Sequence, residues 1–148
     1  AKERYKPMKD ACDDYFYLPH RKEQRGIGGL FFDDLTGKDF SLALNFVERI
    51  GRSFLPAYEA IFHRRRYMPF TEKNRAFQLY RRGRYAEFNL LQDRGTRYGL
   101  QSGRRVENVL ASMPPLVSWV YNYPIADNSP EAELTEYFLK PRDWLPGF

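Results

Sequence analysis

Apolar side chains recur at three- and four-residue steps across residues 38–63, and this spacing is typical of a helix with one apolar face. The segment Thr36–Asp39 supplies a capping start for it. Pro56 lies deep inside the pattern and is expected to kink or split the helix. We expect the apolar face to pack against a core. It is made of Phe40, Ala43, Leu44, Val47, Ile50, Phe54, Tyr58 and Ile61.

Further helices are predicted from signals at their ends. Gly83 fits a C-terminal stop for one of them, and Ser129 followed by Pro130 is a typical helix start. The apolar stretch Leu116–Tyr123 fits either a strand or extended coil. The predicted helices cover residues 1–14, Thr71 to about Arg82, Val106–Met113 and Ser129 to about Lys140.

Short apolar runs between turn signals predict β-strands. Tyr15–Leu18 is one such run, stopped by the proline that follows it. Ile27–Asp33 is typical of a buried strand whose glycines allow close approach of another backbone or a ligand. Tyr85–Leu91 is a third, after which a polar turn at Gln92–Arg97 leads to the short apolar piece Tyr98–Leu100. We therefore expect one α+β domain, with antiparallel strands and helices packed on them.

Composition narrows the class of partner. The 148 residues are enough for one domain of ordinary size. A net charge of +5 favours an anionic partner, and the aromatic share of 17% suggests large packed surfaces or a flat ligand. The single cysteine, Cys12, excludes an internal disulfide and a multi-cysteine metal cluster. No apolar run approaches the roughly 20 residues that cross a bilayer. No signal-peptide pattern opens the sequence, and its first nine residues look like the continuation of a longer protein. A single cysteine fits a reducing compartment, and we expect a cytoplasmic protein.

Candidate chemistry gathers in the stretch Arg81–Arg105. Seven of its residues are arginines, and its only carboxylates are Glu87 and Asp93. The simplest interpretation is a hairpin with solvated arginines, because exposed charges contribute little. Arginine also holds carboxylates and phosphates through a planar fork. Here the arginines cluster at turns, where sites are usually built, and this favours a receptor for a poly-anionic ligand around Asp93.

One segment approaches two known motifs without completing either. Gly26–Gly28 begins like a dinucleotide fingerprint, but Phe31 stands where the third glycine is required. The same segment lacks two of the aromatic positions with which an RNA-recognition strand stacks on bases. A nucleic-acid-binding module is still the alternative function, built on Arg64–Arg66 and Arg81–Arg84 with interleaved aromatic residues.

The chain contains the stretches HRKEQRGIGGLFFDDL, FQLYRRGRYAEFNLLQDRGTRYGLQSGRRVEN, SMPPL and PRDWL. Together they resemble oxygen-dependent coproporphyrinogen III oxidase almost from end to end. The resemblance implies haem biosynthesis: two propionates of coproporphyrinogen III become the vinyls of protoporphyrinogen IX, with release of CO2 and H2O2. It implies a large flat antiparallel sheet sandwiched by helices, a homodimer, molecular oxygen as co-substrate, no organic cofactor and a divalent metal in bacterial members.

The resemblance also implies that this chain is the C-terminal half of a longer protein, inactive without its N-terminal half. Asp93 and Arg94 match the catalytic pair of the family's DRGT motif, in which the acid engages the pyrrole N–H groups of the substrate. Gly103, Arg104 and Arg105 match a substrate-binding corner, and Arg104 stands where the family has glycine or serine.

Two more candidates lie on the link between the first two predicted strands. His20 matches a histidine that the resemblance implies as a metal ligand, and Arg25 is a further candidate for binding substrate carboxylates. The resemblance places dimer contacts in the region from Tyr85 to Val120. A third hypothesis is therefore a fragment that serves only dimerisation. For an animal or fungal source, the mitochondrial intermembrane space is the alternative location.

Overall fold

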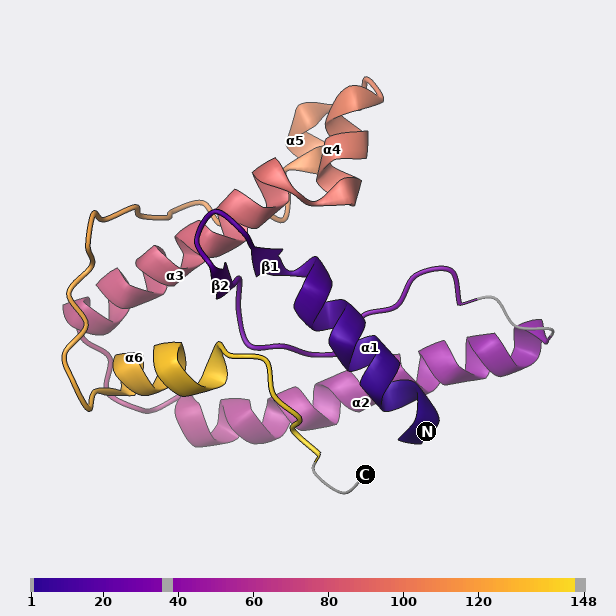
Figure 1. Ribbon diagram of the computed structural model, residues 1–148, viewed down its shortest axis with the longest axis horizontal. Coiled ribbons are helices and arrows are strands. Elements are labelled where there is room, and N and C mark those ends of the chain that lie inside the picture. The colour runs from indigo at the N-terminus through magenta and orange to yellow at the C-terminus, as the bar shows by residue number, and fades with distance from the viewer. Residues whose placement is uncertain (1, 36–38, 146–148) are drawn as a thin grey trace. The chain divides into compact units, whose positions relative to one another are not determined.

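The computed structural model describes residues 2–35 and 39–145 and is mostly helical (Figure 1). These residues fall into two compact units, one between Phe32 and Thr71 and one made of the residues on either side of that segment. The elements in chain order are α1 (Lys2–Tyr15), β1 (Tyr17–Leu18), β2 (Glu23–Gln24), α2 (Phe40–Arg65), α3 (Glu72–Leu91), α4 (Arg94–Gln101), α5 (Val106–Val109), α6 (Pro130–Glu133) and the π-helical turn η1 (Leu134–Phe138).

The helix predicted over residues 1–14 is confirmed as α1. Ion pairs one turn apart stabilise it: Lys6 contacts Asp10 at 2.6 Å, and Lys9 contacts Asp13. The second pair is largely buried, because the loop at Gly28 covers it. A Cβ on Gly28 would lie only 3.0 Å from the Asp13 carboxylate, so glycine is what allows this approach.

The core of the larger unit is a cluster of aromatic rings where α1 and α3 meet the first loops. Leu18 and Phe88 are its most deeply buried side chains. The ring of Tyr15 stacks on Phe31 at 4.5 Å between centroids, and Phe16 lies 5.0 Å from Phe88. Burial of large rings of this kind contributes most of the apolar stabilisation that a small unit has.

The expected large flat sheet is absent from the described residues, whose one sheet is the antiparallel pair β1–β2. Its register places Tyr17 opposite Gln24 and Leu18 opposite Glu23. The strand predicted over Tyr15–Leu18 thus survives only at its end, because Tyr15 still belongs to α1. The buried strand predicted over Ile27–Asp33 is wrong. Its segment is irregular, and Ile27 and Leu30 are exposed.

The strand predicted over Tyr85–Leu91 is also wrong, because α3 continues to Leu91. Gly83 does not stop this helix. A Cβ there would lie 2.8 Å from the carbonyl oxygen of Ser118, so the glycine allows the coil of residues 116–123 to pass close to the helix. The Ser118 N–H donates to the carbonyl of Leu79 at 3.1 Å, and this stretch forms coil, the second of the two predicted alternatives.

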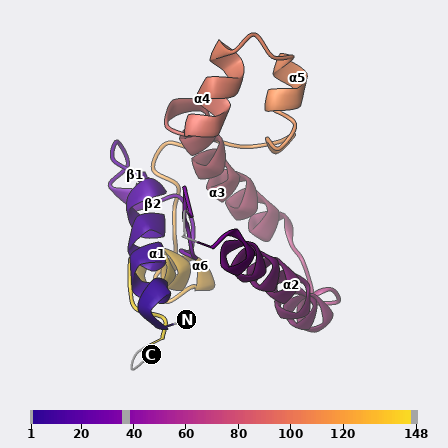
Figure 2. The ribbon, with the colours of Figure 1, turned by 90° about the vertical axis from the view of Figure 1, so that its right-hand side faces the viewer.

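Beyond α3 the chain forms two short helices that lie side by side (Figure 2). The first, α4, includes the short apolar piece Tyr98–Leu100 and most of the polar turn that was predicted before it. The second, α5, begins at Val106 as predicted but ends at Val109, short of Met113. The last predicted helix is confirmed: α6 starts at Pro130 with Ser129 as its N-cap, and η1 continues it to Phe138.

In the smaller unit, α2 confirms the predicted helix as one uninterrupted element. The Asp39 side chain caps it by accepting from the N–H groups of Ser41 and Leu42, whereas residues 36–38 lie outside the described residues. Pro56 lies within the helix and does not split it. No residue of α2 is buried, and the packing of its apolar face against a core stays a prediction. None of the described helices is both long and apolar enough to span a membrane.

Candidate functional site

Asp93 lies at the junction of α3 and α4 and is the N-cap of α4. Its Oδ2 accepts the N–H of Thr96 at 2.7 Å, and its Oδ1 accepts the hydroxyl of Tyr15 at 3.0 Å. Tyr15 in turn accepts the backbone N–H of Arg94 at 3.1 Å. Gly95 leaves room for this arrangement, since a Cβ there would lie 3.2 Å from Oδ2. The carboxylate therefore joins the start of α4 to the end of α1.

The Asp93 carboxyl is an anion at neutral pH. Its partial burial opposes ionisation, but the hydrogen bonds from Thr96 and Tyr15 and the charge of Arg25 outweigh that effect and hold the pKa below the ordinary aspartate value. An ionised carboxylate offers about four lone-pair directions. The two hydrogen bonds of Asp93 use two of them, so the group can still accept donors from a ligand.

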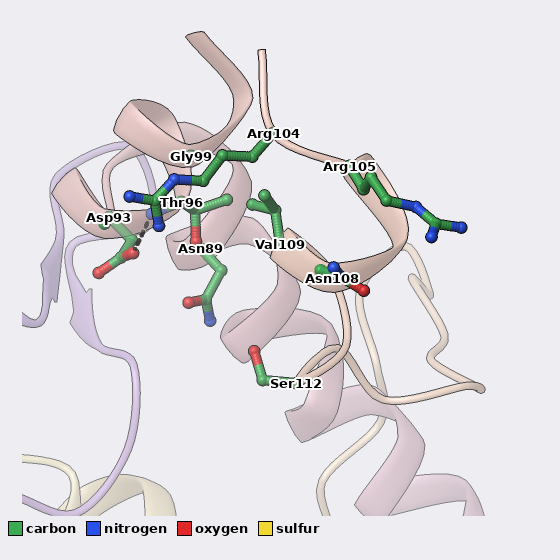
Figure 3. Close-up of a pocket in the computed structure, with 10 residues that line it drawn as sticks. Asn89, Asp93, Thr96, Gly99, Arg104, Arg105, Asn108, Val109 and Ser112 are labelled. Carbon is green, nitrogen blue, oxygen red and sulfur yellow. Dashed lines mark hydrogen bonds between the residues drawn. The ribbon is translucent and has the colours of Figure 1, made fainter. Parts of the chain in front are cut away.

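A hollow of about 560 Å³ opens beside Asp93 between the end of α3, α4 and α5 (Figure 3). In Figure 3 the side chain of Arg104 extends across the hollow toward Asp93, whereas that of Arg105 is directed away from it. The volume lies within the range of ligand pockets, about 300–1,000 Å³. Its lining residues are Asn89, Asp93, Gly95, Thr96, Gly99, Arg104, Arg105, Asn108, Val109 and Ser112.

Two glycines shape the side of the hollow opposite α3. A Cβ on Gly99 would lie 2.9 Å from both methyl carbons of Val109, so α4 and α5 approach this closely only because position 99 is glycine. Gly103 has a φ of +71°, a backbone conformation that glycine adopts without strain. It turns the chain between the two helices and places Arg104 and Arg105 at the rim. The two arginines thus share the hollow with Asp93, whereas Gly103 does not line it.

Arg94 and Arg25 do not line this hollow. The Arg94 guanidinium lies over the ring of Tyr15, 4.7 Å from the centroid. That of Arg25 lies over Phe16 at 4.4 Å, and among the described residues it makes no ion pair. Burial lowers the pKa of Arg25, and the rings hold the cation mainly through cation–π contacts. The structure therefore gives Arg25 a place in the aromatic core.

His20 lies away from the hollow and contacts a carboxylate that is already fully engaged. Its Nε2 is 3.0 Å from Oε2 of Glu87, which also accepts from Arg21 at 2.9 Å, while Trp119 donates to Oε1 at 2.8 Å. Residues 2–35 and 39–145 contain no group of three His, Cys, Asp or Glu side chains that could hold a metal ion. One histidine beside a carboxylate with three donors does not fit the divalent metal that the resemblance implies.

Two arginines of the basic run Arg81–Arg84, which was considered for nucleic-acid binding, form ion pairs within the protein. Arg81 contacts Glu23 at 3.2 Å, and Arg84, which is only 3% exposed, contacts the same carboxylate. Arg84 also lies over the ring of Tyr80, 4.3 Å from the centroid. These two guanidinium groups tie α3 to β2 and do not present their charge to a phosphate backbone.

Sequence reasoning missed four polar residues of the hollow: Asn89, Thr96, Asn108 and Ser112. No single spacing in the sequence signals this group, because α3 ends at Leu91 and α5 at Val109, so Asp93 and Ser112 lie beyond those helices. The four residues come together only through the arrangement of α3, α4 and α5, and the strand predicted over Tyr85–Leu91 gave Asn89 a different local geometry.

The fold and the hollow define a class: a mainly helical protein with an ionised carboxylate and two arginines around one ligand-sized cavity. Comparison with protein families specifies it further. The family model of coproporphyrinogen III oxidase matches residues 1–144. The chain belongs to this family of oxygen-dependent oxidases, which act in haem biosynthesis.

Proposed function

We propose that this chain supplies substrate-binding and catalytic groups for the oxygen-dependent oxidative decarboxylation of coproporphyrinogen III to protoporphyrinogen IX. The observation that carries the proposal is the grouping of Asp93, Arg104 and Arg105 around one hollow in a chain of this family. The substrate bears four carboxylates and a ring of pyrrole N–H groups. It therefore offers anions to the arginines and hydrogen-bond donors to Asp93.

The reaction converts each of two propionates to a vinyl group. The carboxyl carbon leaves as CO2, and the two electrons and two hydrogens that the arm loses reduce O2 to H2O2. Asp93 accepts a pyrrole N–H and stabilises the positive charge that develops on the ring as electrons leave it. A carboxylate with a lowered pKa is a weak base, so its contribution is charge stabilisation and concerted proton movement.

Arg104 binds and orients a propionate in this proposal, because its guanidinium extends over the hollow (Figure 3). A charge-assisted hydrogen bond of this kind contributes about 1.5–3 kcal/mol. Oxygen is the co-substrate, and no organic cofactor takes part. No step is assigned to a metal, because His20 and Glu87 do not fit one. The resemblance predicts further catalytic groups in an N-terminal half. It also predicts that the active form is a cytoplasmic homodimer, and both statements stay predictions.

The proposal is tested by steady-state kinetics on the protein that includes the N-terminal half. Arg104→Ala should raise KM for coproporphyrinogen by about ten- to a hundredfold, which corresponds to the loss of one charge-assisted hydrogen bond. Arg105→Ala should raise it less, because that side chain is directed away from the hollow. Arg49→Ala, on the exposed surface of α2, is the matched control and should leave KM unchanged. An unchanged KM in both pocket variants would refute the role of this hollow.

A further inference from the structure

The side chain of Asn89 lies at the edge of the hollow with one of its two polar atoms already bound. The residue is only 8% exposed and lines the hollow together with Asp93. Its Nδ2 donates to the carbonyl oxygen of Tyr85 at 2.8 Å. Because a carbonyl can only accept, this contact fixes which way round the carboxamide lies and leaves Oδ1 on the other side.

Among residues 2–35 and 39–145, no donor is bonded to the Asn89 oxygen, and this oxygen is not one of the fully buried atoms that lack a partner. It is therefore open to the hollow, where it can accept a hydrogen bond from a ligand. In Figure 3 this oxygen is turned to the side on which Asp93 lies. The hollow thus has two neighbouring hydrogen-bond acceptors, a carboxylate and an amide oxygen, in addition to the arginines at its rim.

Two acceptors together favour a ligand that presents hydrogen-bond donors. A porphyrinogen, in which the macrocycle is reduced, has four pyrrole N–H groups and no acceptor nitrogen in its ring. An oxidised porphyrin has only two N–H groups, and its other two ring nitrogens carry lone pairs that would face the lone pairs of Asn89 and Asp93. A site built to accept hydrogen bonds from N–H groups rejects an analogue that lacks them.

We propose that Asn89 is a specificity-determining residue whose Oδ1 accepts a pyrrole N–H and selects the reduced macrocycle over the oxidised one. This inference rests on the proposed function. The arginines cannot make this distinction, because both forms of the ligand carry the same four carboxylates. Asp93 and Asn89 therefore recognise the oxidation state of the ring, and Arg104 recognises its carboxylates.

The test compares the affinities of coproporphyrinogen, under anaerobic conditions, and coproporphyrin for the protein with its N-terminal half. Asn89→Leu replaces the carboxamide with an apolar group of similar size. It should weaken binding of the porphyrinogen about tenfold, as expected for one lost hydrogen bond, and change binding of the porphyrin by less than about twofold. Asn89→Ser, whose hydroxyl can bond the Tyr85 carbonyl and still accept, should restore part of the preference.

Asn45→Leu, on the exposed surface of α2, controls for the substitution itself and should leave both affinities unchanged. Circular dichroism checks that each variant folds, and Asn89→Ala replaces the leucine variant if that one does not. Equal preference for the reduced ligand in wild type and in the position-89 variants would overturn the role of Asn89 and leave the proposed function standing. A wild-type protein that binds neither ligand would overturn the proposed function itself.

Discussion

Asp93 serves two roles at once, as a cap of α4 and as the anion of the hollow. The cap is the contact to the Thr96 N–H at 2.7 Å, and the link to α1 is the Tyr15 hydroxyl at 3.0 Å. Sequence reasoning singled out this residue through the resemblance and through the arginines around it. It placed Asp93 in a turn between strands, and the capping role depends on a helix that was not predicted.

The two roles of Asp93 can be separated by substitution. Asp93→Ala should lower the free energy of unfolding by about 1–2 kcal/mol through loss of the cap, and it should also strongly reduce kcat. Asp93→Ser keeps a good N-cap oxygen, so its stability should stay within about 0.5 kcal/mol of wild type, while its kcat falls as far as that of the alanine variant. Urea titration and turnover assays measure the two effects. A serine variant with wild-type turnover would show that the carboxylate takes no part in the reaction.

Glu87 makes the stability of the larger unit depend on pH. Burial opposes its ionisation, but hydrogen bonds from Arg21, His20 and Trp119 outweigh burial and lower its pKa from 4.5 to about 2. A pKa lowered in the folded state contributes stability that is fully present above pH 4.5 and is lost as the pH falls toward 2. The shift corresponds to about 3 kcal/mol at neutral pH.

Glu87→Gln should therefore lower the free energy of unfolding by up to about 3 kcal/mol at pH 7. The difference from wild type should shrink as the pH is lowered from 4.5 to 3, because wild type then loses the same contribution. Denaturant titrations at several pH values measure this. Asp10→Asn removes an exposed ion pair of the same unit and should cost less than about 1 kcal/mol. A difference for Glu87→Gln that did not vary with pH would contradict the assignment.

At the scale of elements, the starts of helices could be predicted from the sequence better than whether an apolar run forms a helix or a strand. The N-cap Ser129 was located because a cap depends on a few neighbouring residues, and the cap Asp39 is the last residue of the predicted capping segment Thr36–Asp39. The aromatic and apolar residues of Tyr85–Leu91 favour a strand, although the segment has no β-branched residue. It is helical because α3 continues through Gly83 into the core. Tertiary packing decides whether such an apolar run forms a helix or a strand, and this packing cannot be inferred from the pattern of a single sequence.

The contact between α4 and α5 predicts what a single methyl group would do. Gly99→Ala places a Cβ 2.9 Å from both methyl carbons of Val109, so the two short helices must separate. We expect a loss of about 1–3 kcal/mol in the free energy of unfolding, as for other overpacked contacts, together with a raised KM because the arginine rim moves with α5. Thermal unfolding and kinetics measure both.

Gly51→Ala is the matched control for Gly99→Ala. Both glycines lie inside helices, but a Cβ at position 51 would meet nothing within 4 Å. There the better helix propensity of alanine should raise stability by about 0.5–1 kcal/mol. If both substitutions stabilised the protein, α4 and α5 would not be in the close contact that shapes the hollow.

At the scale of the whole molecule, the two units differ in how their helices are held. Five residues of α3 are buried, whereas no residue of α2 is. The apolar face of α2 was predicted correctly as a pattern, but its packing against a core was not found. The pattern reports which side of a helix is apolar, and it does not report whether a partner covers that side.

Local stability should follow this difference. Helical segments with few buried contacts open with small free energies, and their amides exchange quickly. Hydrogen exchange followed by mass spectrometry should show α2 amides exchanging at least about tenfold faster than those of α3 around Phe88, which is 1% exposed. Asp39→Ala, which removes the cap on the Ser41 and Leu42 N–H groups, should speed exchange in α2 and leave α3 unchanged. If α2 were as protected as α3 in this chain, its apolar face would have to be covered in solution.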